Sequence, residues 1–102
     1  AYHNAKEYHK IGLLKSALIA IDNFARDYPD SEFNEELRYL KIDASYKLAQ
    51  KSIPSKQAER FKEVVSFYEE FVDDYPSSKF LNQSQKLYDA SISNLEKFNK
   101  LL

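Results

Sequence analysis

The chain has 102 residues, of which 30% are charged and 43% are hydrophobic, and its formal net charge is −1. This near-neutral balance excludes recruitment of nucleic acid or anionic lipid through a global positive field. The sequence contains no cysteine, which excludes disulfides, thiolate catalysis and cysteine-ligated zinc. One glycine and three prolines leave little room for hairpins or phosphate-binding loops, so the composition favours an all-α protein.

The first half of the chain predicts three helices. A short helix over residues 1–11 turns at Gly12, the only glycine. Residues 13–28 show apolar side chains at the three- and four-residue spacing of one broad helix face, and Pro29 ends that helix because proline disfavours the α conformation in the preceding residue. The next helix is expected over residues 31–49, with Ser31 accepting a hydrogen bond from its first free amides.

The helix over residues 31–49 has apolar side chains on two faces, which predicts a position in the interior of a helical array. One stripe contains Leu37, Leu40, Ala44 and Leu48, and the other contains Tyr39, Ile42 and Tyr46. The second stripe fits a core, and the alternative is that it lines a concave groove, where tyrosine is a favoured contact residue.

The second half of the chain predicts a loop and two further helices. Residues 50–56 contain Pro54 and indicate the loop, and helices are expected over residues 55–75 and 78–99. The last helix carries Ser84 and Ser91 where the third helix carries apolar residues, which we interpret as the polar surface that a terminal repeat needs.

A ten-residue phrase occurs twice, from Phe24 to Phe33 and from Phe71 to Phe80, at an offset of 47 residues and with six identical positions. A period of this size indicates stacked helical repeats, which form surfaces for binding other proteins. Seven apolar positions of the second helix also recur as apolar or aromatic residues 47 positions later. The repeat therefore covers whole helices as well as the phrase.

Several residues of the repeat carry a family resemblance. Gly12, Ala17 and Pro29 have the spacing of an inter-helix turn, a small residue at a helix crossing and the closing proline of a tetratricopeptide repeat. This resemblance implies antiparallel helix pairs in a right-handed superhelical array of about five helices, forming one domain over residues 1–102 of a longer protein. The positions that we expect to define the repeats are Gly12, Ala17, Tyr28, Pro29, Ser31, Tyr75, Pro76 and Ser78.

The phrase Tyr-Pro-x-Ser in both copies, within repeats longer than usual, resembles the BamD family of outer-membrane assembly lipoproteins, here its C-terminal repeats. The resemblance implies a scaffold at the periplasmic face of the outer membrane that binds the periplasmic domains of the β-barrel insertase. It also implies a lipid anchor in a region before this chain, and no insertion of the chain itself into the membrane. The alternative is a general envelope repeat adaptor, such as the periplasmic partner of the Tol-Pal system, which binds a peptide or protein.

No pattern in the sequence predicts an enzyme, a cofactor or a metal. His3 and His9 are six residues apart, whereas helical metal ligands are four apart, so packing or surface positions are favoured. The carboxylates Glu69, Glu70, Asp73 and Asp74 lie off the apolar stripe of their helix, and a solvated helix face explains them better than a metal site.

Charge is distributed unevenly along the second half of the chain. Residues 37–62 hold seven bases and two acids, whereas residues 63–78 hold five acids and no base. One interpretation is alternating solvated faces, and the other is a basic docking face formed by the third helix and the loop after it, which would steer association with an acidic partner. On the docking interpretation, the expected partner contacts are Arg38, Tyr39, Lys41, Tyr46 and Arg60.

Overall fold

Five helices follow one another along the chain, and the expected all-α fold is confirmed. The structure is a computed structural model that describes the backbone of residues 1–101 and the side chains of residues 1–98. Leu102, the last residue of the expected domain, lies outside the described part. The helices are α1 (Tyr2–Lys10), α2 (Leu14–Asp27), α3 (Asn34–Lys51), α4 (Pro54–Asp74) and α5 (Leu81–Leu101).

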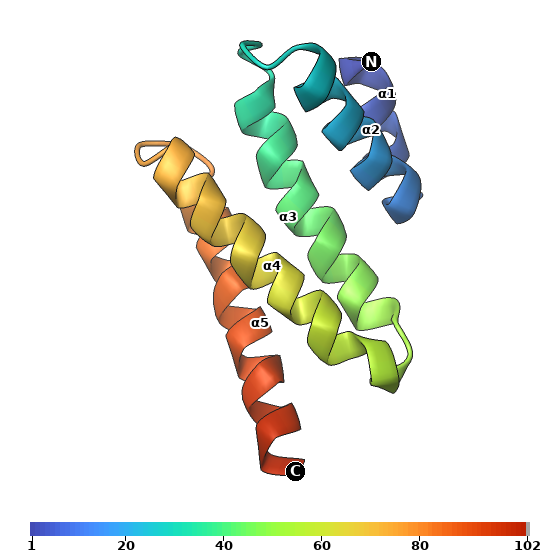
Figure 1. The fold of residues 1–102 in the computed structure, drawn as a ribbon, viewed down its shortest axis with the longest axis vertical. Coiled ribbons are helices and arrows are strands. Elements are labelled where there is room, and N and C mark those ends of the chain that lie inside the picture. Colours follow the sequence, from blue (N-terminus) through green and yellow to red (C-terminus); the bar gives the residue numbers. More distant parts are fainter. Residues whose placement is uncertain (102) are drawn as a thin grey trace.

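The helices form two layers, as expected for a tetratricopeptide-like array. Consecutive helices pack as neighbours, and α3 also contacts both α1 and α5 (Figure 1). The helices α1, α3 and α5 therefore make one layer, whose open side we call the inner face. The helices α2 and α4 make the other layer, and the surface of α3 between them is called the outer valley.

The turn between α1 and α2 depends on Gly12. Its φ of 83° lies in the left-handed region, which glycine adopts without the steric cost of a Cβ. The Leu13 amide donates to the Tyr8 carbonyl at 2.9 Å and the Gly12 amide donates to the His9 carbonyl at 3.2 Å, which is the pair of bonds of a Schellman motif. The predicted turn is therefore present, and it sends α2 back against α1.

The two Tyr-Pro turns have nearly the same geometry. Tyr28 has φ −132° and ψ 65°, and Tyr75 has φ −133° and ψ 65°. Each tyrosine amide donates to a carbonyl four residues earlier, of Phe24 or Phe71, at 2.8 Å. The two copies of the phrase thus end their helices in the same way, at Asp27 and Asp74, as the prolines predicted.

The predicted starts of the helices at Ser31 and Ser78 are wrong by three residues. The Ser31 hydroxyl accepts the Phe33 amide at 3.1 Å and the Ser78 hydroxyl accepts the Phe80 amide at 3.0 Å, so both serines close short turns. The helix α3 begins only after Phe33, without a side-chain cap. Serine side chains stabilise such turns as well as helix starts, and the pattern alone does not separate the two.

The expected loop over residues 50–56 is also much shorter in the structure. Helix α3 continues to Lys51 and α4 begins at Pro54, which leaves Ser52 and Ile53 between them. Proline is accepted in the first helical turn because its missing amide would have no intrahelical partner there. Pro54 therefore starts a helix where the sequence pattern placed it inside a loop.

Two apolar clusters hold the array together, and α3 contributes to both. One joins α1, α2 and α3 around Ala5, Ile21, Phe24 and Leu37. The other joins α3, α4 and α5 around Ile42, Val64 and Phe71, with partly buried aromatic rings packed against them. Ala17 and its counterpart Val64 are both fully buried, as expected for residues at a helix crossing.

The interpretation of Ser84 and Ser91 as polar surface of a terminal helix is wrong, because both side chains are fully buried. Each hydroxyl donates to the carbonyl four residues earlier in α5, Phe80 or Leu87, at 2.8 Å. This bond satisfies a buried hydroxyl within its own helix. Within the described side chains, the polar surface of α5 consists instead of the exposed Asn82, Gln83, Gln85, Lys86, Asp89, Ser93, Glu96 and Lys97.

Candidate functional site

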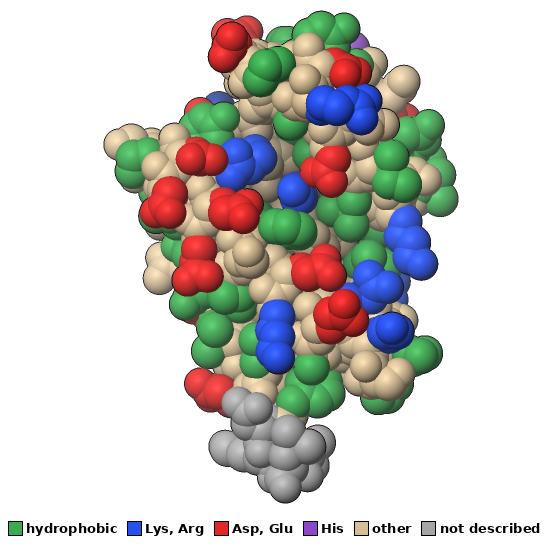
Figure 2. All heavy atoms as spheres, in the orientation of Figure 1, with side chains coloured by type: hydrophobic (Ala, Val, Ile, Leu, Met, Phe, Trp, Pro, Cys, Tyr) green, Lys and Arg blue, Asp and Glu red, His purple; other side chains and the backbone are tan. Residues whose placement is uncertain are grey.

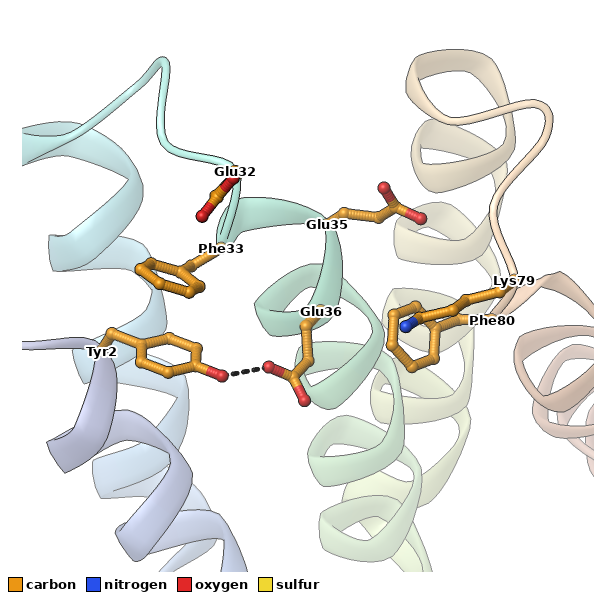
Figure 3. Close-up of a pocket in the computed structure, with 7 residues that line it drawn as sticks. All are labelled: Tyr2, Glu32, Phe33, Glu35, Glu36, Lys79 and Phe80. Carbon is orange, nitrogen blue, oxygen red and sulfur yellow. Dashed lines mark hydrogen bonds between the residues drawn. The ribbon is translucent and has the colours of Figure 1, made fainter.

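The inner face has a hollow where the first turns of α1, α3 and α5 meet. It measures about 320 Å³ and is lined by Tyr2, Glu32, Phe33, Glu35, Glu36, Lys79 and Phe80. Figure 3 shows Tyr2 and Phe33 on one side, Phe80 and Lys79 on the other, and Glu36 between them. The Tyr2 and Phe33 rings stack with centroids 4.2 Å apart, and Phe33 is 42% exposed. The hollow thus offers aromatic rings to solvent between charged side chains.

Glu36 is the polar centre of this hollow. Its carboxylate accepts the Tyr2 hydroxyl and lies 3.4 Å from the Lys6 ammonium (Figure 3). The hydrogen bond from Tyr2 lowers the pKa of Glu36, against the effect of partial burial, and Lys6 lowers it further. The pKa of Lys6 is raised by its contact with Tyr2 and by the Glu36 charge. These contacts fix α1 against α3, and both carboxylate oxygens of Glu36 are engaged.

A second polar contact joins the same two helices two turns further on. His9 Nε2 lies 2.6 Å from Asp43 Oδ2, and Lys47 Nζ lies 2.8 Å from the same oxygen. Burial raises the pKa of Asp43, but the hydrogen bonds from His9 and Lys47 outweigh it, so its pKa lies below the usual value. His9 is therefore a packing residue of the α1–α3 contact, as favoured from the sequence.

The predicted contacts Arg38 and Lys41 lie in the outer valley, where carboxylates of the same chain already bind them. Arg38 Nη1 lies 3.0 Å from Asp74 Oδ2 of α4, and Lys41 Nζ lies 3.1 Å from Asp22 Oδ1 of α2. Lys41 Nζ also lies 4.1 Å from the centroid of the Phe67 ring, so this side chain bridges α2 and α4. Both bases therefore contribute to the packing of the array, and their role in partner binding stays a prediction.

The predicted contacts Tyr39 and Tyr46 lie in the apolar cluster of α3, α4 and α5, away from these bases. Tyr39 stacks on Phe80 at 5.1 Å between centroids, and Tyr46 meets the edge of Phe61 at 5.8 Å. The core interpretation of this stripe is thus favoured over the groove. Arg60 Nε is buried in α4 without a hydrogen-bond partner among the described side chains. The structure brings Arg38 and Lys41 together, but not with the two tyrosines.

Exposed bases lie towards one end of the α3–α4 pair, interspersed with the exposed Glu59 and Glu63, and exposed acids lie towards the other end. Lys51, Lys56 and Lys62 are exposed around the short α3–α4 turn, and no ion pair is present at them in the part of the chain with described side chains. Glu69, Glu70 and Asp73 are exposed towards the other end of α4. In Figure 2, acidic side chains gather over the upper part of α4, and several Lys and Arg side chains lie at the lower right, near the α3–α4 turn.

The sequence analysis missed the lining of the inner hollow, above all Tyr2, Phe33, Glu36 and Lys79. One signal was available in the spacing. Tyr2 and His9 are seven residues apart, as are their partners Glu36 and Asp43, so both contacts join residues 34 positions apart. Two parallel helices in contact produce such a constant difference. A search for matched i, i+7 polar pairs could therefore have found this contact.

The described residues show no metal centre and no membrane span. Over the residues searched, no three His, Asp or Glu side chains gather closely enough to hold a metal ion. Within the same residues, none of the helices has the length and apolar character needed to cross a bilayer.

Comparison with known proteins places the chain in a family. No curated protein sequence matches it. The family model described as "YfiO: Outer membrane lipoprotein" matches residues 1–97, almost the whole chain. This match confirms the BamD-like resemblance that the Tyr-Pro-x-Ser phrases indicated, and the helical array is the fold that the resemblance implied. The chain therefore belongs to the YfiO family of outer membrane lipoproteins.

Proposed function

We propose that the chain is a non-catalytic scaffold of the β-barrel assembly machinery, which binds the periplasmic domains of the barrel insertase at the periplasmic face of the outer membrane. The observation that carries this proposal is the family match over residues 1–97. The fold is compatible with it because a stacked array presents its surfaces in a fixed arrangement. Little ordering entropy is then lost when a partner binds.

The docking surface that we propose is the basic region around the end of α3, the turn after it and the first half of α4. The exposed bases there are Lys51, Lys56 and Lys62, which can meet acidic side chains of a partner at little desolvation cost. Arg38 and Lys41 would extend this surface into the outer valley, although a partner must then compete with Asp74 and Asp22. The inclusion of Tyr39, Tyr46 and Arg60 in the surface also stays a prediction.

The experiment measures binding of the purified insertase periplasmic domains to the immobilised chain, both from the same organism, by biolayer interferometry. The test variant is Lys51→Glu/Lys56→Glu/Lys62→Glu, whose side chains are exposed. We expect its association rate to fall at least about tenfold, with a smaller change in the dissociation rate, because exposed charges act mainly on encounter.

The matched control is Lys10→Glu/Lys86→Glu/Lys97→Glu, which changes the net charge by the same amount at exposed positions elsewhere. Equal losses in both triple variants would mean that net charge, and no particular surface, drives binding. Absence of binding by the unmodified chain would contradict the proposed partner itself.

A second candidate function is a general envelope adaptor that holds a peptide on its inner face, for example with the Tol-Pal system. The aromatic hollow favours this candidate, because Phe33 is 42% exposed beside Tyr2. Immobilised Tol-Pal periplasmic domains in the same assay would separate the two candidates. Binding to those domains alone, lost in Phe33→Ser, would support the adaptor and contradict the scaffold of the barrel machinery.

A further inference from the structure

A second hollow lies between α4 and α5, on the surface that corresponds to the outer valley of the first repeat. It measures about 330 Å³ and is lined by Tyr68, Glu69, Val72, Asp73 and Tyr88. The Tyr68 and Tyr88 rings form its wall, with centroids 4.7 Å apart. Glu69 and Asp73 are exposed at its edge, and the lining contains no base. Its chemistry is therefore aromatic and acidic.

The first repeat shows what occupies the equivalent position. The offset of 47 residues relates Asp22 to Glu69 and Lys41 to Tyr88. In the first repeat the ammonium of Lys41 lies 3.1 Å from Asp22 and is 4.1 Å from an aromatic centroid, that of Phe67. In the second repeat tyrosine replaces this lysine, so the carboxylate of Glu69 keeps its place while the cation of the same chain is gone.

The surroundings of the hollow add further negative charge to a position that already lacks the cation of the first repeat. The last turn of α4 carries no basic residue, and its carbonyl end has a partial negative charge of its own. Burial raises the pKa of Tyr68, and the nearby Asp89 raises it further, which places a third carboxylate close to the rings. Lys62 is the preceding base of α4 and is seven residues from Glu69, about 10 Å along the helix. The lining thus holds two carboxylates and no base, and a third carboxylate acts on one of its rings.

We infer that the hollow between α4 and α5 takes a lysine or arginine side chain of a partner protein, in the way that Lys41 fills the equivalent position of the first repeat. Two carboxylates beside two tyrosine rings suit such a cation, because aromatic rings attract positive charge and carboxylates bind it directly. This surface lies apart from the basic docking surface proposed above and has the opposite charge, so the inference does not depend on the insertase as partner.

The experiment uses the full chain, labelled with ¹⁵N, and a capped Gly-Leu-Arg-Leu-Gly peptide as the probe. A twin peptide with citrulline in place of arginine keeps the shape but has no charge. At low ionic strength we expect the arginine peptide to shift the amide signals of Glu69, Val72 and Tyr88, and the citrulline peptide to shift them far less. Equal shifts with both peptides, or shifts confined to other surfaces, would overturn the inference.

Matched variants test the carboxylates. Glu69→Gln/Asp73→Asn removes two charges at the hollow and should weaken peptide binding about 30-fold at low salt, because Coulomb's law gives a factor of about five for each contact in water. Glu63→Gln/Glu70→Gln removes two charges from exposed positions of the same helix outside the lining. An equal loss in this control would overturn the inference, because a diffuse field would then explain the binding.

A third variant uses the repeat itself. Tyr88→Lys restores the lysine of the first repeat, and we expect this lysine to form an ion pair with Glu69 and abolish peptide binding. Tyr88→Phe keeps the aromatic ring and should retain peptide binding. Undiminished peptide binding in Tyr88→Lys would contradict the inference. Circular dichroism of each variant checks that the helices are intact.

Discussion

The two copies of the repeat have the same backbone geometry at their Tyr-Pro turns. They differ in whether a side chain donates hydrogen bonds to the carbonyls of the turn. Both Tyr-Pro turns have the same dihedral angles within a degree and the same amide bond of 2.8 Å. In the first copy, the buried Asn34 donates to the carbonyls of Tyr28 and Pro29 at 2.8 and 3.2 Å. In the second copy Leu81 stands at that position. The backbone geometry of the turn therefore follows from the Tyr-Pro sequence. The hydrogen bonds from the Asn34 side chain are an addition of the first copy.

The second helix of each copy also meets the preceding layer differently. Both copies stack an aromatic ring on the preceding layer, Phe33 on Tyr2 and Phe80 on Tyr39. Helix α3 also contacts α1 through the carboxylates Glu36 and Asp43. The positions that correspond to the two carboxylates in α5 are Gln83 and Ala90. The aromatic stack is thus common to both copies, and the polar contacts are added to it between α1 and α3.

The largest effect should come from the helix crossing that both copies share. Ala17→Glu places a charge at a fully buried position, and we expect it to destabilise the fold by more than about 4 kcal/mol. Thermal unfolding followed by circular dichroism measures this. Ile19→Glu is the control, because Ile19 is 62% exposed on the same helix and should cost little. An unchanged melting temperature in Ala17→Glu would refute the repeat packing.

An intermediate effect is expected from exchanging the equivalent residues Asn34 and Leu81 of the two turns. Asn34→Leu gives the first copy the residue of the second and removes two hydrogen bonds, at a cost of about 1 to 2 kcal/mol. Chemical denaturation measures the loss, and amide exchange of Ser31 reports whether the turn itself opens. If Asn34→Leu were as stable as the unmodified chain, the two hydrogen bonds of Asn34 would contribute nothing to the stability of the fold. The reciprocal Leu81→Asn tests whether the second copy can use the same closure.

The smallest expected effect is a pH dependence of stability that comes from the carboxylates of the α1–α3 contact. The pKa values of Glu36 and Asp43 lie below their ordinary 4.5 and 3.8, so the unfolded chain binds protons more readily than the folded one. The contribution of these two carboxylates to the free energy of unfolding is complete when the pH lies above their ordinary pKa values. It is lost as the pH falls through their lower pKa values in the folded state. It should amount to about 1 kcal/mol after allowance for solvent screening.

Urea unfolding at about pH 5 and about pH 3 measures this contribution. The double variant Glu36→Gln/Asp43→Asn should lose less stability between the two pH values than the unmodified chain. An equal loss in both proteins would assign the acid sensitivity to other carboxylates.

Much of the fold follows from local patterns in the sequence. The apolar spacing around Ile21 and Val64 predicts helices, and the prolines at 29 and 76 predict where two of them end. The starts of α3 and α5 were placed too early because a serine after proline can close a turn or cap a helix. Local patterns do not separate these two roles, since both use the same hydroxyl and nearby amides.

The candidate surfaces were less predictable, because they depend on which charges find partners within the chain. Arg38 and Lys41 belong to a basic run in the sequence, but α2 and α4 place Asp22 and Asp74 beside them. The inner hollow combines Tyr2 of α1 with Phe33 and Phe80 from the turns before α3 and α5, and no single segment contains this combination. The pairing of α1 with α3 is a long-range contact, which only the regular difference of 34 residues hints at.

The central position of α3 has a consequence for how the chain unfolds. In a linear stack each unit touches only its neighbours, so the ends can fray while the middle persists. Here α3 contacts every other helix and contributes side chains to both apolar clusters. Loss of this one helix would leave α1–α2 and α4–α5 as two separate hairpins. The array should therefore melt as one cooperative unit, in which proteolysis at either end reports on the stability of the middle.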